Sequence, residues 1–310
     1  MVNKTVQPGT RRATNTKKST KRKKVNKSSG ANRSKSTSKQ VQSSPFVTWL
    51  KQFIYLLLWN RFTKSALACG IALLLIYGAY CAFIRPYSYR WMPCYGNKSY
   101  GICVPYKYEV HGLDVSRHQG NIDWDTLVDN IDENAPLNFV FMKATEGGDF
   151  NDINFKANFE SAKKVNLIRG AYHFFSPHTS AQAQAKHYIK QVKLQKGDLP
   201  PVLDVEVLGR HTKSSISDSV LVWLDIVEKH YKVKPILYTS FKFKNRYLND
   251  IKFNVYPFWI AHYYVGKLRY TGTWSFWQHT DIGRVPGINK DVDLNVFNGT
   301  IEELRAMTIH

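Results

Sequence analysis

Residues 201–206, with the sequence PVLDVE, place two carboxylates two positions apart behind a short apolar run. Side chains alternate between the faces of a β-strand, so Asp204 and Glu206 share one face and the apolar residues between them share the other. Two carboxylates on one face repel each other, which a purely structural strand gains nothing from. The pattern instead suits a site that needs one protonated and one ionised carboxyl group.

The elements that must position this pair form an alternating series. Strands are predicted at residues 111–116, 138–147, 168–176, 201–206, 235–240, 258–264, 274–280 and 292–299. Apolar residues at helical spacing predict helices around residues 124–131, 155–166, 180–194 and 217–231, between the first five strands. Eight strands in this order indicate an α/β barrel, in which active sites lie at the carboxyl ends of the strands.

Polar side chains recur at those strand ends. The set comprises Asp114, Lys143, Glu146, Tyr172, His173, Asp204, Glu206, Tyr238, His262, Gln278 and Asp293. The repetition of position predicts one shared site, with the four acids Asp114, Asp204, Glu206 and Asp293 at its centre. We expect His173 and His262 to be structural or substrate-contacting rather than metal ligands, because no partner stands at ligand spacing. We expect Lys143 to pair with Glu146 or with one of the four acids.

The chain carries a net charge of +21, but this charge is concentrated at one end. The first 108 residues hold 20 Lys and Arg and no Asp or Glu, while the rest hold 24 basic and 23 acidic residues. Residues 1–45 are too polar to form a core, so we predict a disordered basic cytoplasmic tail. Its charges set membrane topology, with contact to anionic lipid as an additional role. No folded motif indicates specific nucleic-acid binding, although electrostatic contact stays open.

Residues 65–84 form a run of 20 without a charge, which matches the hydrocarbon thickness of a bilayer. We predict a transmembrane helix there, preceded by an amphipathic juxtamembrane segment at residues 46–64. The upstream positive charge predicts a single-pass protein of the cytoplasmic membrane, with its N-terminus in the cytoplasm. The remainder would face the periplasm or cell wall. A cleaved signal peptide is the competing interpretation, but the long leader favours an uncleaved anchor.

Cysteines are few and unevenly placed. Cys69 and Cys81 fall within the apolar run and are predicted to be apolar fillers. Cys94 and Cys103 stand beyond it, in a linker at residues 85–108, where an oxidising compartment permits a local disulfide. No zinc-ligand pattern is present in the sequence, and we expect neither metal nor cofactor.

The motifs GLDVSRHQGNIDW, FVFMKATEG, RGAYHFF, PVLDVE, WIAHY, FWQHT and VDLNVF occur in that order. In this respect residues 109–310 resemble the family 25 glycoside hydrolases, the Chalaropsis-type lysozymes or N-acetylmuramidases. The resemblance implies a flattened (β/α)5(β)3 barrel similar to a TIM barrel. It also implies hydrolysis of the β-1,4 bond between N-acetylmuramic acid and N-acetylglucosamine in the glycan strands of peptidoglycan.

The same resemblance implies a role for each acid. Glu206 matches the general acid, Asp204 its partner carboxylate, and Asp114 and Asp293 the flanking acids. The order of these motifs leaves Arg117 and His262 without an assigned role. Aromatic residues on the strands either stack on sugar rings or pack in the core. For substrate binding we predict Tyr172, Tyr238, Tyr263 and Gln278.

Two questions stay open at the level of sequence. The hydrolysis could follow a retaining, an inverting or a substrate-assisted route, the last with Asp204 orienting the substrate acetamido group. A different class of function is a catalytically silent peptidoglycan-binding module tethered to the membrane. Four acids in the family's order favour the enzyme, since a binding module has no need of both Asp204 and Glu206.

Overall fold

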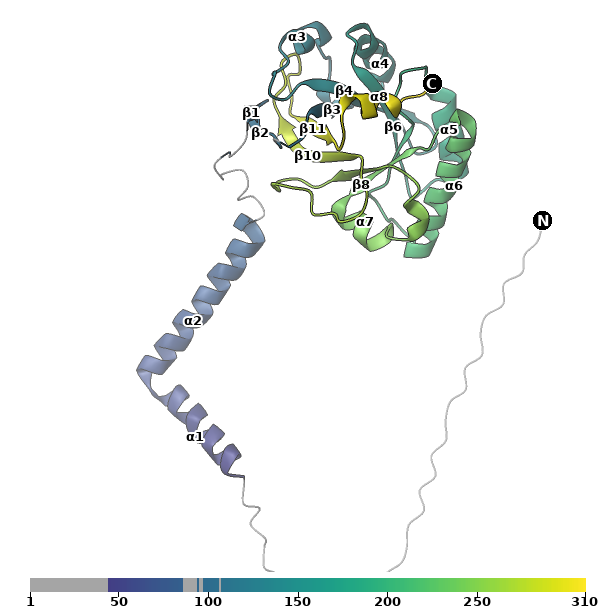
Figure 1. Ribbon diagram of the computed structural model, residues 1–310. Coiled ribbons are helices and arrows are strands. Elements are labelled where there is room, and N and C mark those ends of the chain that lie inside the picture. Colours follow the sequence, from purple (N-terminus) through teal and green to yellow (C-terminus); the bar gives the residue numbers. More distant parts are fainter. Residues whose placement is uncertain (1–43, 86–93, 95–96, 106) are drawn as a thin grey trace, which may run out of the picture. The chain divides into compact units, whose positions relative to one another are not determined.

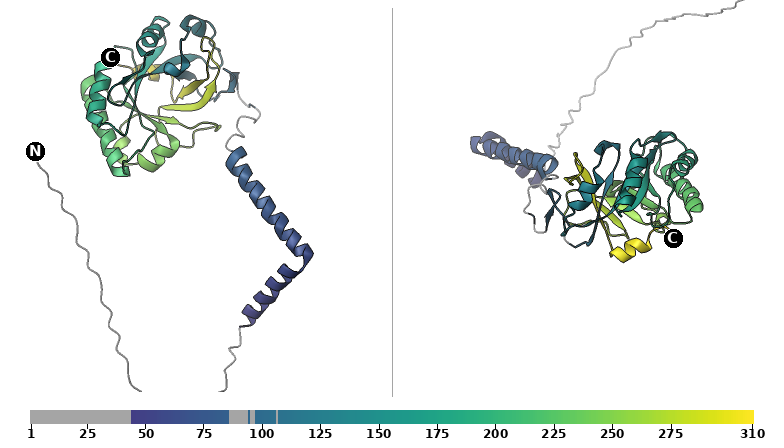
Figure 2. Two further views of the ribbon diagram at one scale, coloured as in Figure 1. Left: turned by 180° about the vertical axis from the view of Figure 1, so that it is seen from behind. Right: turned by 90° about the horizontal axis from the view of Figure 1, so that it is seen from above.

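The protein is described here from a computed structural model, which covers residues 44–85, 94, 97–105 and 107–310. The chain divides into two compact units, Met1–Cys69 and Gly70–His310, and each is described by itself. Residues 1–43 of the predicted tail lie outside the described residues. Figures 1 and 2 show the two N-terminal helices and the barrel.

Two helices follow the described N-terminal end. Helix α1 (Pro45–Trp59) begins after Ser44, whose hydroxyl accepts a hydrogen bond from the Val47 amide. Helix α2 (Arg61–Ala79) continues into a π-helical turn (Tyr80–Ile84). Residues 61–84 together form a 24-residue apolar helix, which is long enough to cross a bilayer.

Eight strands close into a barrel. They are β3 (Val110–Val115), β4 (Leu137–Glu146), β6 (Ile168–Phe174), β7 (Val202–Asp204), β8 (Ile236–Ser240), β9 (Phe258–Ala261), β10 (Phe276–Gly283) and β11 (Val292–Phe297). The hydrogen-bonded order is β3-β11-β10-β9-β8-β7-β6-β4, and pairing of β3 with β4 closes the ring. Strand β11 is antiparallel to both of its neighbours, and the other pairs in the ring are parallel. The short strand β5 (Phe150–Asn151) extends the end of β4 as a hairpin.

Helices surround the ring of strands in both figures. They are α3 (Trp124–Asp129), α4 (Phe155–Lys164), α5 (Ala181–Gln191), α6 (Lys213–Tyr231) and α7 (Phe241–Tyr247). Each follows one of the first five barrel strands, and the last three strands follow without a long helix between them. All eight predicted strands and all four predicted helices are therefore present, in a mixed α/β fold.

The sequence pattern did not reveal α7 or the last helix, α8 (Ile301–Ala306). These helices have seven and six residues, which is too short for a helical repeat of apolar residues to show. Helix α8 is held by a capping box, in which Thr300 and Glu303 satisfy each other's backbone amides. Its Leu304 packs against the cluster inside the barrel.

Strand alternation divides the core into two clusters. Inside the barrel, Phe139 and Phe141 of β4 pack with Trp259 of β9 and Phe276 of β10. The alternate residues of the same strands face the helices and form a larger outer cluster. Apolar rings thus fill the interior, and the polar side chains lie at the end of the barrel where the parallel strands have their carboxyl ends and the antiparallel β11 has its amino end.

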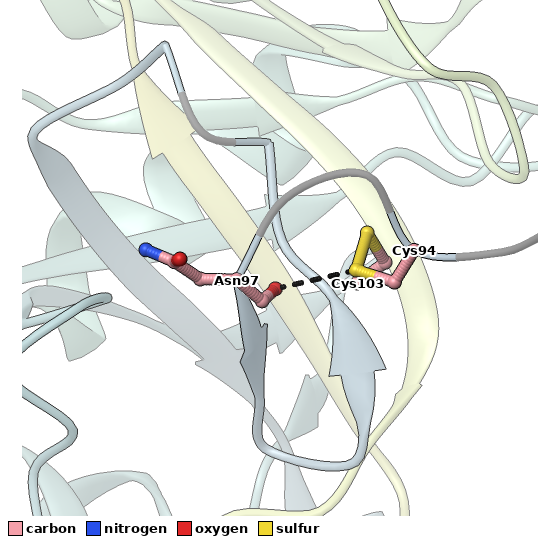
Figure 3. Close-up of a disulfide and its surroundings, with 3 residues drawn as sticks. All are labelled: Cys94, Asn97 and Cys103. Atoms are coloured by element: carbon pink, nitrogen blue, oxygen red, sulfur yellow. Dashed lines mark hydrogen bonds between the residues drawn. A yellow bond between two sulfur atoms is a disulfide. The ribbon is translucent and has the colours of Figure 1, made fainter.

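A small hairpin precedes the barrel. Its strands are β1 (Lys98–Ser99) and β2 (Ile102–Cys103), and a disulfide joins Cys94 to Cys103, the pair expected from the sequence (Figure 3). Ser99 donates a hydrogen bond of 2.7 Å to Asp132, and the buried Tyr100 donates one of 3.1 Å to the Ala135 carbonyl. Part of the predicted linker is therefore packed against the domain that was expected to begin at residue 109.

Two glycines, Gly112 beside Phe139 and Gly170 beside Phe141, make room for the rings inside the barrel. A Cβ atom on Gly170 would lie 2.5 Å from the Phe141 ring, which itself stacks on Trp259 at 4.5 Å. We expect Gly170→Ala to lower the free energy of unfolding by about 1–3 kcal/mol, because the packed rings have no free space into which to move. Thermal and urea denaturation measure the change.

Gly266→Ala is the matched control, because nothing lies within 4 Å of the added Cβ and its backbone is not left-handed. Equal stability of the two variants would show that Gly170 does not set the packing of the interior.

Candidate active site

A pocket of about 240 Å³ lies at the carboxyl ends of the parallel barrel strands. Asp293 reaches it from the amino end of β11, not from a carboxyl end as predicted, because β11 is antiparallel to its neighbours. All eight predicted site residues line it: Asp114, Tyr172, Asp204, Glu206, Tyr238, Tyr263, Gln278 and Asp293. The lining also includes Ser116, His118, Lys143, Phe174 and Trp259. The structure brings the eight predicted residues together, while their chemical roles stay predictions. Across the described part of the chain, no group of three His, Cys, Asp or Glu side chains is placed to hold a metal ion.

The two acids of the PVLDVE segment reach the pocket from the end of β7. The strand ends at Asp204, two residues before the predicted end. Its extended path continues because the Val205 amide donates to the Tyr238 carbonyl at 3.0 Å and the Val205 carbonyl accepts from Thr239 at 2.6 Å. Val205 is fully buried in the outer cluster, so the acids on either side of it both face the pocket.

Asp204 and Glu206 differ in their surroundings. Asp204 is buried, and its Oδ1 has no hydrogen-bond partner among the described residues. Burial raises the pKa of Asp204 well above its usual range, and repulsion by Glu206 raises it further. Glu206 has an exposed side chain at the rim, where the partial burial of its carboxyl raises its pKa as well. Both carboxyl groups thus hold protons more tightly than free acids do.

Asp114, on β3, is held by two amide side chains. Its Oδ2 accepts hydrogen bonds from Gln278 at 2.7 Å and from Asn295 at 2.8 Å. Burial raises the pKa of Asp114 to about 6, the two amide hydrogen bonds oppose that rise, and repulsion by Glu206 adds to it. The amides therefore favour the ionised form of a carboxyl group that burial alone would neutralise.

Aromatic donors fix the direction of both amides. The hydroxyls of Tyr238 and Tyr263 donate to Gln278 Oε1 at 2.7 and 2.6 Å. The indole of Trp259 donates to Asn295 Oδ1 at 2.8 Å. Because each amide oxygen is occupied in this way, each amide NH₂ group is directed at Asp114.

Asp293 stands directly opposite Asp114 on the neighbouring antiparallel strand. Burial raises the pKa of Asp293 to about 9, and repulsion by Asp114, Asp281 and Glu206 adds to the rise. Like charges opposite each other in a sheet destabilise it, and a proton on Asp293 removes that repulsion. Asp293 therefore holds its proton to higher pH than Asp114 does.

Seven aromatic residues on or near the strands separate into two groups. Tyr172, Phe174, Tyr238, Trp259 and Tyr263 line the pocket. The other two, Trp274 and Trp277, pack against the ring of Tyr108 at 5.8 and 6.0 Å, outside the barrel. Trp277 alternates with the inward-facing Phe276 and Gln278, which accounts for its outward position, whereas Trp274 lies before the start of β10.

Asn295 was not predicted as a site residue. It lies two positions after Asp293 in VDLNVF and is completely buried on the same strand face. Alternation along the strand could have located it, but the sequence does not show that its amide points at Asp114. Lys143 pairs with Glu146 at 2.7 Å, one of the two partners expected. His173 is a buried structural residue bonded to Thr145 and Gln184.

A family model described as glycosyl hydrolases family 25 matches residues 113–288. The chain belongs to this family. The match runs from the strand that carries Asp114 to the loop before β11 and contains Asp204, Glu206 and Gln278. This protein is accordingly a glycoside hydrolase of the lysozyme and muramidase group.

Relatives and solved structures agree with the family. An uncharacterized protein, YegX, of Escherichia coli strain K12 is 44% identical over 72% of this chain and 80% of its own length. Lysozyme M1 of Streptomyces globisporus is 33% identical over 64% of this chain and 71% of its own. A family 25 glycosyl hydrolase from Bacillus anthracis superposes with a TM-score of 0.60 at 34% identity, over 65% of this chain and 94% of that structure.

The protonated state of Asp293 predicts a pH dependence of stability. Its pKa in the folded protein, about 9, lies above the ordinary 3.8, so folding is favoured at low pH and loses stability as pH rises from about 4 to about 9. We expect Asp293→Asn to remove this loss and to raise the free energy of unfolding at pH 9 by several kcal/mol, with little change at pH 4. Urea denaturation at both pH values measures the difference.

Asp149→Asn, at an exposed carboxylate, is the control. If Asp293→Asn were no more stabilising at pH 9 than at pH 4, the buried proton on Asp293 would be excluded.

Proposed function

We propose that this protein is a peptidoglycan hydrolase that cleaves the β-1,4 bond between N-acetylmuramic acid and N-acetylglucosamine. The observation that carries the proposal is the pair of unlike carboxyl groups in one pocket, Glu206 at the rim and Asp204 buried beneath. Lysozyme M1 and the N,O-diacetylmuramidase of Chalaropsis sp., which is 27% identical over 64% of this chain, support the substrate class.

Glu206 acts as the general acid. A sugar oxygen is a poor leaving group and must receive a proton as positive charge develops at the anomeric carbon. The raised pKa of Glu206 keeps a proton available closer to neutral pH than an ordinary carboxyl group does. Its exposed position lets the side chain reach a glycosidic oxygen that lies across the mouth of the pocket.

Asp204 orients the substrate. A buried acceptor without a partner is costly unless a ligand supplies the donor, and the unpartnered Oδ1 fits the N–H of a 2-acetamido group. That hydrogen bond favours the ionised form of Asp204, so substrate binding leaves the proton on Glu206. The acetamido oxygen can then act as the internal nucleophile of a substrate-assisted reaction.

Asp114 and Asp293 stabilise the charge that develops on the sugar. The fixed negative charge on Asp114, directed by two amides, faces the same pocket and lowers the energy of an oxocarbenium-like transition state. Asp293, protonated beside it, can donate a hydrogen bond to a sugar hydroxyl without adding to the repulsion. Tyr172 and Tyr263 lie on the pocket wall, where their rings can contact the sugar.

The membrane anchor is part of the same proposal. The apolar helix of residues 61–84 crosses the cytoplasmic membrane once, with the basic N-terminal segment in the cytoplasm, in contact with anionic lipid. The catalytic barrel then stands on the exported side, where peptidoglycan lies and where the disulfide between Cys94 and Cys103 can form.

Digestion of purified peptidoglycan by the full-length protein in detergent tests the reaction. We expect new reducing ends of N-acetylmuramic acid, identified by mass spectrometry, and at least a hundredfold lower rate for Glu206→Gln, because the amide cannot donate the acid proton. Glu133→Gln, at an exposed carboxylate, should keep the activity of the parent.

Reducing ends of N-acetylglucosamine would place the cut at the other linkage. Tight binding without release of fragments would contradict hydrolysis and favour a glycan-binding module.

Replacing Leu74 and Leu75 by Lys tests the anchor, since two charges near the centre of an apolar helix oppose insertion by several kcal/mol. We expect the parent protein to stay with membranes during alkaline carbonate extraction and the variant to be extracted. Replacing the same two residues by Ile is the control. Extraction of the parent protein would contradict an integral anchor.

A further inference from the structure

A cation without an acidic partner stands beside the acidic pocket. Arg117 is exposed in the short 3-10 helix (Arg117–Gln119) that follows β3, between the pocket residues Ser116 and His118. Its guanidinium lies 4.7 Å from the centre of the Phe150 ring, and no ion pair to it occurs among the described residues. Such a group has its N–H donors free for an anion.

The position of Arg117 is fixed by its surroundings. Its backbone amide donates to Asp152 at 2.8 Å, and Asp152 is buried. The turn is closed by a capping box in which Ser116 and Gln119 satisfy each other's backbone amides. Phe150 lies on the short strand β5, which pairs with the end of β4, and its ring contacts the guanidinium. The backbone that carries Arg117 is therefore fixed before any ligand binds, and the ring contact limits the positions of its side chain, which reduces the entropy lost on binding.

A second cation shares the same ring. Lys143 Nζ lies 5.8 Å from the centre of the Phe150 ring and 4.8 Å from that of Phe174, and it lines the pocket. Glu146 pairs with Lys143 at 2.7 Å and compensates its charge. We call Arg117, Lys143 and Phe150 the cationic wall. Within it, Arg117 supplies the charge that no acid neutralises.

An anionic ligand needs such a wall at this place. Four carboxyl groups line the pocket, and any negative charge on a ligand meets repulsion from those that are ionised. A neutral sugar polymer would need no cation at the rim. Peptidoglycan, in contrast, carries carboxylates on its stem peptides and on those muramic acid residues that bear no stem peptide.

We propose that the cationic wall binds a carboxylate of the peptidoglycan strand and thereby makes Arg117 a specificity residue for anionic over neutral glycans. This inference rests on the proposed function and names the part of the substrate that the acidic pocket alone would repel. The guanidinium geometry favours paired hydrogen bonds to a carboxylate.

The test compares two glycan substrates. The first is soluble peptidoglycan strands freed of stem peptides, in which every muramic acid bears an ionised carboxylate. The second is the same strands after their carboxylates have been coupled to ammonia, which gives neutral amides. For the full-length protein we expect a KM about three to ten times higher on the amidated strands, with kcat little changed. The preference should weaken as NaCl is raised, because the rim is exposed.

Arg117→Ala should show the higher KM on both substrates, with no preference left, and Arg117→Lys should keep part of the preference. Arg246→Ala is the matched control, because Arg246 is also exposed and stacks on an aromatic ring, Tyr247, but, unlike Arg117, it is not flanked in the chain by residues that line the pocket. It should keep the parent's preference. Peptide-bearing strands, measured in parallel, show whether stem-peptide carboxylates add to the effect.

The inference is overturned if the parent hydrolyses both substrates equally well, or if Arg117→Ala keeps the parent's preference. Absence of hydrolysis by the parent would instead contradict the proposed function. Direct binding of the two kinds of strand to Glu206→Gln, with and without Arg117→Ala, then decides the inference independently of catalysis.

Discussion

Four carboxyl groups can share one small pocket only if most of their mutual repulsion is removed. In this barrel the removal has two parts. Asp293 takes a proton, and Asp114 keeps its charge because Gln278 and Asn295 direct their amide groups at it. These amides are in turn oriented by Tyr and Trp side chains of the interior. The electrostatics of the site therefore depend on the packing of the barrel, down to the space that Gly170 leaves for Phe141.

Asp204 and Glu206 differ in their exposure to solvent. Both follow the same strand and face the same side, yet one is buried with an unused acceptor and the other reaches solvent. Burial makes both hold protons, and a ligand that donates to Asp204 decides which of them keeps one. The cationic wall beside Phe150 adds the opposite charge at the rim. The pocket and its rim thus present charges of both signs to a substrate.

Much of this could be predicted from the sequence, for identifiable reasons. Alternation predicted that Asp204 and Glu206 share a face, and the rule that barrel sites lie at the carboxyl ends of strands placed Asp114 with them. Asp293 joins them for a different reason, because β11 is antiparallel and brings its amino end to the pocket. The sequence did not predict the helices α7 and α8, because they are too short to show a helical repeat of apolar residues. The hydrogen bonds of the site could not be predicted either. Alternation can place Asn295 on the inner face, but its hydrogen bond to Asp114 depends on how strands distant in the sequence pair. The contact between Arg117 and Phe150 depends in the same way on the β4–β5 hairpin.

The most direct test of the central claim is a crystal structure of Glu206→Gln with a bound peptidoglycan fragment that spans the cleavable bond. The account predicts the glycosidic oxygen within hydrogen-bonding distance of the residue 206 side chain, and the acetamido N–H of the neighbouring sugar on Asp204 Oδ1. A fragment bound with its acetamido group away from Asp204, and its glycosidic oxygen out of reach of residue 206, would contradict it.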